Sequence, residues 1–238
     1  MARKRIVFVI VEGPSDEEAL GVLLGRIYDR SSVFVHIMHG DITTQRGVWP
    51  ERIEGRLAKE VQAYASSNHY TRTDFREIIH IVDMDGAYIP PEKVVQDAAA
   101  RRVTYAETEI RTRNKEAIES RNQQKAANLD RLCGCDSIWG VPYRVFYMSC
   151  NLDHVLYNKL NSSNAQKEED AYQFAKAYRN AIPEFLAFLS NSDFSVRLDY
   201  ESSWAYIKQG LHSLERHTNL GLCFPKQAAK AAALDKSK

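Results

Sequence analysis

Residues 6–16 have the sequence IVFVIVEGPSD, in which six consecutive apolar residues are followed by Glu12, a Gly-Pro step and Asp16. An unbroken, β-branched apolar run of this length is typical of a strand that is buried on both faces of a parallel sheet. Ser15 or Asp16 can cap a following helix, whose apolar positions recur at helical spacing as far as Ile27. The stretch therefore predicts a strand, a polar turn and a helix, which is the first unit of an α/β fold.

Further apolar runs extend this pattern along the chain. Residues 33–38 are expected to form a second strand, and apolar residues at helical spacing over 53–64 predict the next helix. Residues 78–82 form a third expected strand, which ends in Asp83-Met84-Asp85-Gly86, and residues 141–148 form a fourth. A β-α-β-α-β order predicts a parallel sheet with right-handed connections, covered by helices.

The length of 238 residues suits one α/β domain with an appendage. We assign the α/β domain to residues 1–155, with an insertion at about 87–140 whose polar stretch 92–132 predicts mostly helical structure. Residues 156–238 have a helical pattern and are expected to form a helical C-terminal extension.

The composition indicates the cellular compartment of the protein but does not indicate its partners. Lys and Arg total 32 against 31 Asp and Glu, so any affinity for nucleic acid must come from a local basic surface. The four cysteines lack the spacing of a zinc site, and we expect free thiols in a reducing cytoplasm. The longest N-terminal apolar run is too short for a signal sequence or a membrane span, so we expect a cytoplasmic protein without a membrane partner.

Carboxylates follow two of the expected strands at the point where each strand ends. Glu12 closes the first strand, Asp83 and Asp85 close the third, and Asp16 lies one helical turn after Glu12. Because ligands of open parallel sheets bind at the carboxyl ends of strands, we expect these side chains to share one crevice. Clustered carboxylates are costly without a cation, and hard oxygen ligands suit Mg²⁺ or Mn²⁺. Such a site is typical of phosphodiester hydrolysis and phosphoryl transfer.

Each motif alone has an ordinary explanation. A glutamate after a strand is usually a solvated loop residue, and an Asp-x-Asp-Gly sequence is often only a turn. Their joint occurrence at the ends of two buried strands favours function, because acids with perturbed pKa values cluster at such sites.

Both acidic motifs resemble those of the TOPRIM family. Residues 11–16, VEGPSD at the start of a helix, resemble its glutamate motif, and residues 83–86, DMDG, resemble its DxD motif. His39-Gly40 is similar to the glycine at the end of the second TOPRIM strand. The resemblance covers roughly residues 5–155 and is greatest to OLD-type and related small phage-defence nucleases. It implies a TOPRIM-like parallel sheet.

This resemblance implies a Mg²⁺-dependent endonuclease that hydrolyses phosphodiester bonds with two Mg²⁺ or Mn²⁺ ions. An acidic residue follows the fourth strand in these nucleases, at the place that Asp153 occupies here. The metal ligands implied by the resemblance are Glu12, Asp16, Asp83, Asp85 and Asp153. Glu12, Asp83 and Asp85 are implied to be catalytic. The family's catalytic lysine has no motif to locate it, and we assign it to Lys208 from its place on a late helix.

The resemblance favours DNA as the substrate, but it leaves RNA open because a small TOPRIM enzyme that matures ribosomal RNA has a similar length. Topoisomerases and bacterial primases fit less well, since they need a separate tyrosine domain or a zinc module. The sequence has no GxxxxGK[ST] motif, so any ATP dependence would come from an ATPase partner, with antiviral defence as the expected setting. A homo-oligomer is also left open.

Two other classes of function compete with the nuclease. The DMDG sequence also resembles the nucleophile motif of haloacid-dehalogenase phosphatases, although Ala87-Tyr88 follows where Thr or Val is usual and a β-α-β-α unit precedes it. The non-enzymatic alternative is a TOPRIM module that binds nucleic acid or a protein partner. Metal-dependent cleavage of nucleic acid would separate these classes.

The expected insertion is locally basic. Residues 101–131 contain eight basic and five acidic residues, a net charge of +3. This segment can hold phosphates beside the metal site, or it can be a solvated helical pair with i,i+4 ion pairs. The residues that we expect to bind nucleic acid are Arg101, Arg111, Arg113 and Arg121.

Overall fold

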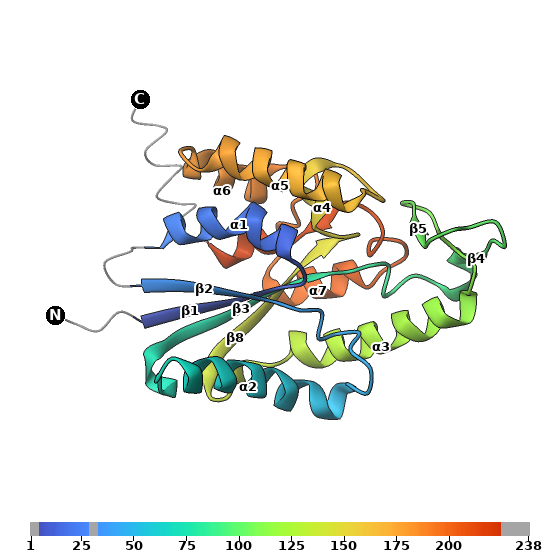
Figure 1. Cartoon of the computed structure of the whole chain (residues 1–238). Helices are drawn as coiled ribbons and strands as arrows, with labels where there is room; N and C mark the ends of the chain where they lie inside the picture. The colour runs from blue at the N-terminus through green and yellow to red at the C-terminus, as the bar shows by residue number, and fades with distance from the viewer. Residues whose placement is uncertain (1–4, 29–32, 225–238) are drawn as a thin grey trace.

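The computed structural model describes residues 5–28 and 33–224, and for Val33–His39 it describes the backbone alone. The side chain of His39, which forms part of one motif, therefore lies outside the described residues. The described chain is an α/β fold built on a mostly parallel, six-stranded sheet (Figure 1).

Four parallel strands form the centre of the sheet. They lie in the order β2-β1-β3-β8, and β7 and β9 pair with β8 in antiparallel fashion. The bounds of the strands are β1 Arg5–Val11, β2 Val33–His39, β3 Phe75–Asp83, β7 Ser137–Ile138, β8 Val141–Ser149 and β9 His217–Thr218. The four strands predicted from apolar runs are thus confirmed, and they extend the predicted ranges by a few residues.

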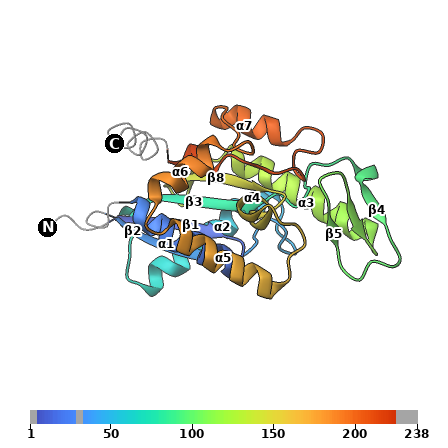
Figure 2. The ribbon, with the colours of Figure 1, turned by 90° about the horizontal axis from the view of Figure 1, so that it is seen from above.

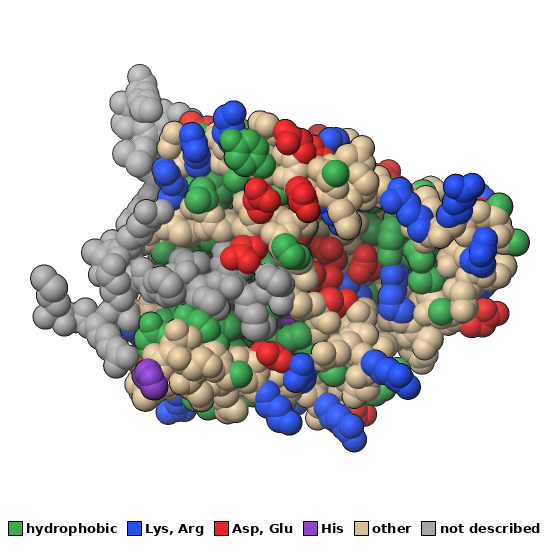
Figure 3. Space-filling view, in the orientation of Figure 1, with side chains coloured by type: hydrophobic (Ala, Val, Ile, Leu, Met, Phe, Trp, Pro, Cys, Tyr) green, Lys and Arg blue, Asp and Glu red, His purple; other side chains and the backbone are tan. Residues whose placement is uncertain are grey.

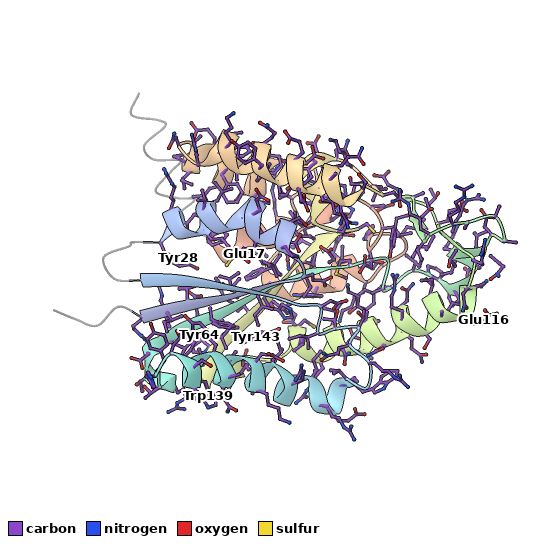
Figure 4. The ribbon with its side chains drawn as sticks, viewed as in Figure 1. Glu17, Tyr28, Tyr64, Glu116, Trp139 and Tyr143 are labelled. Carbon is purple, nitrogen blue, oxygen red and sulfur yellow. The ribbon has the colours of Figure 1, made fainter. Side chains whose placement is uncertain are left out.

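Alternate residues of β1 face opposite layers of helices. Val7 and Val9 pack in a core with α1 (Pro14–Ile27), whereas Phe8 and Ile10 pack with α2 (Pro50–Ser67). This alternation explains the unbroken apolar run, because both faces of the strand are buried. Figures 1 and 2 show α1, α5 and α6 on one side of the sheet and α2 on the other, and Figure 4 shows Tyr64 and Tyr143 in the layer between the sheet and α2.

The chain leaves β1 toward β2 on one side and returns to β3 on the other side. β1 and β3 are neighbours in the sheet. The connection that leaves β1 passes over the face covered by α1, and the connection that leaves β3 passes over the face covered by α2. Open α/β sheets bind their ligands at such a topological switch point, just beyond the carboxyl ends of the two strands.

The prediction of a mostly helical insertion is only partly correct. Residues 94–112 form a small second sheet, and only α3 (Lys115–Cys133) is a long helix. The sheet consists of β4 Val94–Gln96, β5 Thr104–Tyr105 and β6 Ile110–Thr112. β-branched residues favour these short strands, and buried Val94 and Ile110 give them a core of their own. We call this small sheet and the chain around it, residues 94–113, the lobe. It lies at the N-terminal end of α3, where Glu116 is also found (Figures 1, 2 and 4).

The C-terminal part of the chain packs on both faces of the sheet. Its helices are α4 Leu152–Tyr157, α5 Asn164–Tyr178, α6 Ile182–Asn191 and α7 Tyr200–Ile207. α4, α5 and α6 join the core of α1, whereas Trp204 and Ile207 of α7 join the core of α2. A search of the described residues finds no helix with the length and apolar character of a membrane span.

Candidate active site at the carboxyl ends of β1 and β3

The turn after β1 is fixed by Asp16. The helix α1 is capped at Gly13, and not at Ser15 or Asp16 as predicted, and Pro14 occupies its first position. The backbone N–H of Gly13 donates to Asp16 Oδ2 at 2.9 Å, an interaction that resembles one half of a capping box. Asp16 is buried. It therefore holds the turn that presents Glu12 to the crevice.

Glu12 joins the ends of the two central strands. Its Oε1 accepts the backbone N–H of Asp83 at 3.0 Å. The same oxygen lies 3.2 Å from Lys125 Nζ, and this ammonium donates to Asp85 Oδ2 at 2.7 Å. Three predicted site residues, Glu12, Asp83 and Asp85, are thus brought together at the switch point, with a lysine between two of the carboxylates.

Lys125 is the site residue that the sequence did not identify. It comes from the middle of α3, and its side chain is 0% exposed. Asn122 and Asn128, one helical turn to either side, are buried as well. Asn128 Nδ2 donates to the carbonyl of Thr43 at 2.7 Å and to that of Val48 at 2.9 Å. α3 therefore presents a buried polar face to the crevice.

The DMDG turn owes its shape to two residues in the left-handed region. Asp85 has φ +49° and Gly86 has φ +72°, so the chain reverses sharply after β3. A Cβ on Gly86 would lie 2.9 Å from atoms of Ile110 and of Leu214, which leaves no room for a larger residue. The carbonyl of Asp85 accepts from Arg121 Nη2 at 2.8 Å. The turn is thereby held while the Asp85 carboxylate faces Lys125.

Asp83 lies at the electrostatic centre of the crevice. Its Oδ1 accepts the backbone N–H of Leu152, the first residue of α4, at 2.9 Å. Burial, together with the nearby charges of Glu12 and Asp16, raises the pKa of Asp83 well above its ordinary value. A positive charge placed nearby would therefore stabilise the ionised form of Asp83.

The other acids around Lys125 differ in their proton affinity. Burial raises the pKa of Glu12 to about 8, and Lys125 opposes this shift without cancelling it. Burial acts to raise the pKa of Asp85 and Asp41 as well, but other groups together outweigh it. Lys125 and Arg121 hold the pKa of Asp85 below its ordinary value. Lys125 and the hydrogen bonds from Thr43 and Thr44 do the same for Asp41. Asp41, just after β2, also accepts hydrogen bonds from the backbone N–H and hydroxyl of Thr43 at 2.9 and 2.6 Å. Lys125 therefore favours the ionised forms of Asp85 and Asp41, whereas burial favours the protonated forms of Glu12 and Asp83.

A second acidic group lies beside α4. Asp153 is buried, and its Oδ2 lies 2.9 Å from Lys167 Nζ of α5. Among the described residues Asp153 Oδ1 has no hydrogen-bond partner. Burial raises the pKa of Asp16 to about 6 against the opposing effects of the Gly13 N–H and Lys167, with the charge of Asp153 adding to the rise. The predicted ligands Asp16 and Asp153 are thus electrostatic neighbours, and Asp16 is also a neighbour of Asp83.

The donor set of the crevice fits a hydrated hard cation. The ammonium groups of Lys125 and Lys167 lie against carboxylates. A divalent ion at the same places would neutralise the same negative charge. In the described part of the chain, three ligand atoms lie within 4.8 Å of one another only at His212, Glu215 and His217, and not among these acids. Mg²⁺ commonly uses one or two carboxylates and retains several waters, so no preformed three-carboxylate cage is required.

The structure does not bring Lys208 to the crevice. Its Nζ lies 2.7 Å from Asp130 Oδ1 and 5.7 Å from the centre of the Tyr88 ring, and it approaches Cys133 Sγ at 3.8 Å. Lys125 is the lysine that contacts the predicted acids.

The four predicted nucleic-acid-binding arginines fall into two groups. Arg121 lines the crevice, where it also donates to Tyr105 Oη at 2.5 Å. Arg101, Arg111 and Arg113 are exposed on the lobe, and Arg111 pairs with Glu109 at 2.6 Å. Figure 3 shows acidic side chains gathered in a hollow beside this lobe, with basic side chains on the lobe itself. A basic rim therefore borders an acidic crevice.

Fold and site together define an α/β protein with a carboxylate crevice at its topological switch point. No family model, curated protein or solved structure matches the chain.

Proposed function

We propose that this protein is a metal-dependent nuclease of the TOPRIM type, which hydrolyses phosphodiester bonds in nucleic acid. The observation that supports this function best is the convergence of Glu12 and Asp85 on one buried lysine, with Asp83 hydrogen-bonded to Glu12. Ligands of open α/β sheets bind at the switch point, and groups with perturbed pKa values cluster at functional sites, so the position and the raised pKa values of Asp16 and Asp83 both favour a functional site.

Each carboxylate has a role that follows from its contacts. Divalent ions, when bound, would supply Lewis-acid stabilisation of phosphoryl oxygens and a water of lowered pKa. Asp83 and Asp85 are the proposed ligands on the β3 side, and Asp16 and Asp153 those on the α4 side, consistent with two ions. Glu12 is placed to ligate or to hold the attacking water, because its Oε1 is fixed by the Asp83 N–H. Lys125 stabilises negative charge in the crevice.

The exposed arginines of the lobe suit a long anionic substrate. Arg101, Arg111 and Arg113 are on the surface next to the crevice, where phosphates beyond the scissile bond would lie. DNA is the proposed substrate, and antiviral defence with an ATPase partner is the proposed setting.

Cleavage assays with the purified full-length chain test this function. We expect supercoiled plasmid to be cut with Mg²⁺ or Mn²⁺ and left intact with EDTA. Asp83→Asn and Glu12→Gln should each lower the rate by roughly a hundredfold or more, because each removes a carboxyl group that could ionise beside a bound cation. Asp136→Asn, at an exposed position, is the matched control.

Cleavage by folded Asp83→Asn at the wild-type rate would refute the assignment of the site. If RNA alone were cut, the substrate class would change and the site would stand. Hydrolysis of a small phosphomonoester without any cleavage of nucleic acid would favour a phosphatase instead.

A further inference from the structure

Two histidines and a glutamate lie together on the segment that runs from the end of α7 into β9. The side chains of His212, Glu215 and His217 each offer one ligand atom, and these three atoms lie within 4.8 Å of one another. His217 Nε2 is 3.4 Å from Glu215 Oε2, and His212 Nε2 is 3.8 Å from the same oxygen. All three side chains are partly exposed, so an ion could reach them from solvent.

The hydrogen bonding of His212 fixes which nitrogen is free. Its Nδ1 lies 2.7 Å from the backbone carbonyl of Tyr206, and a carbonyl oxygen can only accept. Nδ1 therefore carries a proton, and in the neutral ring Nε2 keeps its lone pair on the side of Glu215. Metal-ligating histidines are oriented in this way, with the second nitrogen donating to a carbonyl or carboxylate. The Tyr206 ring stacks on His212 at a centroid distance of 4.0 Å and further limits its rotation.

Two of the three spacings between the ligand atoms are close to those of tetrahedral coordination, and the third is within 4.8 Å. Bonds of roughly 2.0–2.1 Å at tetrahedral angles place neighbouring ligand atoms about 3.3 Å apart. The two distances to Glu215 Oε2 require little adjustment to reach this value. Arg216 lies between two of these ligands in the sequence. Its guanidinium does not repel an ion at this site, because Nη2 donates to the carbonyl of Val155 at 2.6 Å.

We propose that His212, Glu215 and His217 form a second metal site, which takes a Zn²⁺-class transition-metal ion through two imidazole nitrogens and one carboxylate oxygen. Two histidines with one glutamate is a ligand set of zinc enzymes, and imidazole selects such ions over Mg²⁺. The site is thus chemically distinct from the all-carboxylate crevice, and it does not depend on the nuclease function.

An ion at this site would fix the segment that supports the DMDG turn. Between the ligands, the carbonyl of Ser213 accepts the N–H of Gly86 at 3.0 Å, and Ser213 Oγ accepts the N–H of Tyr88 at 3.2 Å. The carbonyl of His212 accepts from Ser149 Oγ at 2.8 Å. The ion would therefore close a short loop whose backbone holds the end of the acidic motif in place.

Zinc titration of the tag-free full-length protein against a chromophoric chelator tests the site. We expect one tightly bound Zn²⁺ in the wild type and in Asp83→Asn/Asp85→Asn, which lacks two acids of the crevice. His212→Gln and His217→Gln should each lower the affinity by at least about a hundredfold, since even partners behind a ligand contribute 10- to 100-fold. Zn²⁺ should also raise the melting temperature of the wild type and not of these two variants.

Two controls separate this site from other zinc ligands. His69→Gln removes an exposed histidine elsewhere, and Cys133→Ser/Cys135→Ser removes the two partly exposed thiols. Both variants should bind Zn²⁺ as the wild type does. Circular dichroism establishes that each variant is folded. Equal affinity of the wild type and His217→Gln, or loss of binding only in the cysteine variant, would overturn the proposal.

Discussion

Lys125 is buried at the cost of its hydration, and its carboxylate partners compensate for that cost. With its Nζ 2.7 Å from Asp85 and 3.2 Å from Glu12, the ammonium forms charge-assisted hydrogen bonds in a medium of low polarity. These charges raise the pKa of Lys125 well above its ordinary value, although burial acts in the opposite direction. The crevice is thus organised around one permanent positive charge.

Removal of this charge should destabilise the protein. Lys125→Met fills similar space but leaves the partly buried carboxylates of Asp85 and Asp41 without their cation. Breaking a fully buried ion pair costs roughly 3–5 kcal/mol, which is the upper limit for this loss. The loss of stability should be smaller at low pH, because Asp85 and Asp41 can take up protons in the variant. Urea unfolding at pH 5 and pH 8 measures both effects. Lys115→Met, at the start of the same helix, loses only a solvent-accessible pair with Glu119 and should change the free energy of unfolding by less than about 0.5 kcal/mol. Equal stabilities of the two variants at pH 8 would contradict this account.

The acids of the site could be found from sequence, but the lysine could not. Glu12 and Asp83 follow apolar runs directly, so their place at strand ends is a local property. Lys125 reaches the same point from 113 residues further along the chain than Glu12, and only the tertiary fold determines that contact. One signal was present, because Arg121, Lys125 and Asn128 share a helical face with spacings of four and three residues.

At the scale of elements, α3 connects the basic lobe with the acidic crevice. Its first turn is capped by Asn114, whose side chain accepts the N–H of Ala117 at 3.0 Å, beside the small sheet. Its middle supplies Arg121 and Lys125, and Asn128 holds the loop after β2. One helix thus sets the distance from the exposed arginines of the lobe to the carboxylates.

The exposed arginines of the lobe should determine how binding responds to salt. Replacing Arg101, Arg111 and Arg113 with Gln should weaken DNA binding and reduce the slope of log K against log salt by up to about one unit per lost phosphate contact. Binding is measured in EDTA, so that cleavage does not interfere. Arg26, Arg72 and Arg76 are equally exposed and lie near the other end of the sheet, and the matching triple variant should keep the wild-type slope. Equal slopes for both triple variants would assign the lobe to an ordinary solvated surface.

Long strands could be predicted from the sequence, and short strands could not. β1 and β3 were predictable because each is a long run buried on both faces. The strands of the lobe have two or three residues each, and polar residues surround them. Their formation depends on pairing with one another and on the packing of Ile110 beside Leu214, which comes from the far end of the chain. No local pattern encodes such a contact.

At the scale of the whole molecule, the sheet concentrates negative charge that the composition conceals. The formal net charge is +1, yet the carboxyl ends of β1, β2 and β3 together present Glu12, Asp41, Asp83 and Asp85. Parallel strands necessarily bring these ends to one edge. Folding therefore works against repulsion among these acids, and protons or cations that enter the crevice should stabilise the fold.

The burial of Glu12 gives the stability of the protein a defined pH dependence. Folding raises the pKa of Glu12 from an ordinary value of 4.5 to about 8, because the side chain is buried. The folded state thus holds a proton that the unfolded state has lost, so the associated stability is full below pH 4.5 and is lost as the pH rises to about 8. In EDTA, the titration of Glu12 should by itself lower the free energy of unfolding over this range by up to about 1.4 kcal/mol per pH unit.

Glu12→Gln keeps the size of the side chain and removes this titration, so its stability should fall less steeply between pH 5 and pH 8. Asp83, whose pKa is also raised by burial and by its acidic neighbours, remains in the variant and should keep part of the slope. Saturating Mg²⁺ should flatten the wild-type curve, because a bound cation favours the ionised carboxylates. Urea unfolding at several pH values measures these curves, with exposed Glu18→Gln as the control that keeps the wild-type slope. Parallel curves for the wild type and Glu12→Gln in EDTA would show that Glu12 is not the group that titrates.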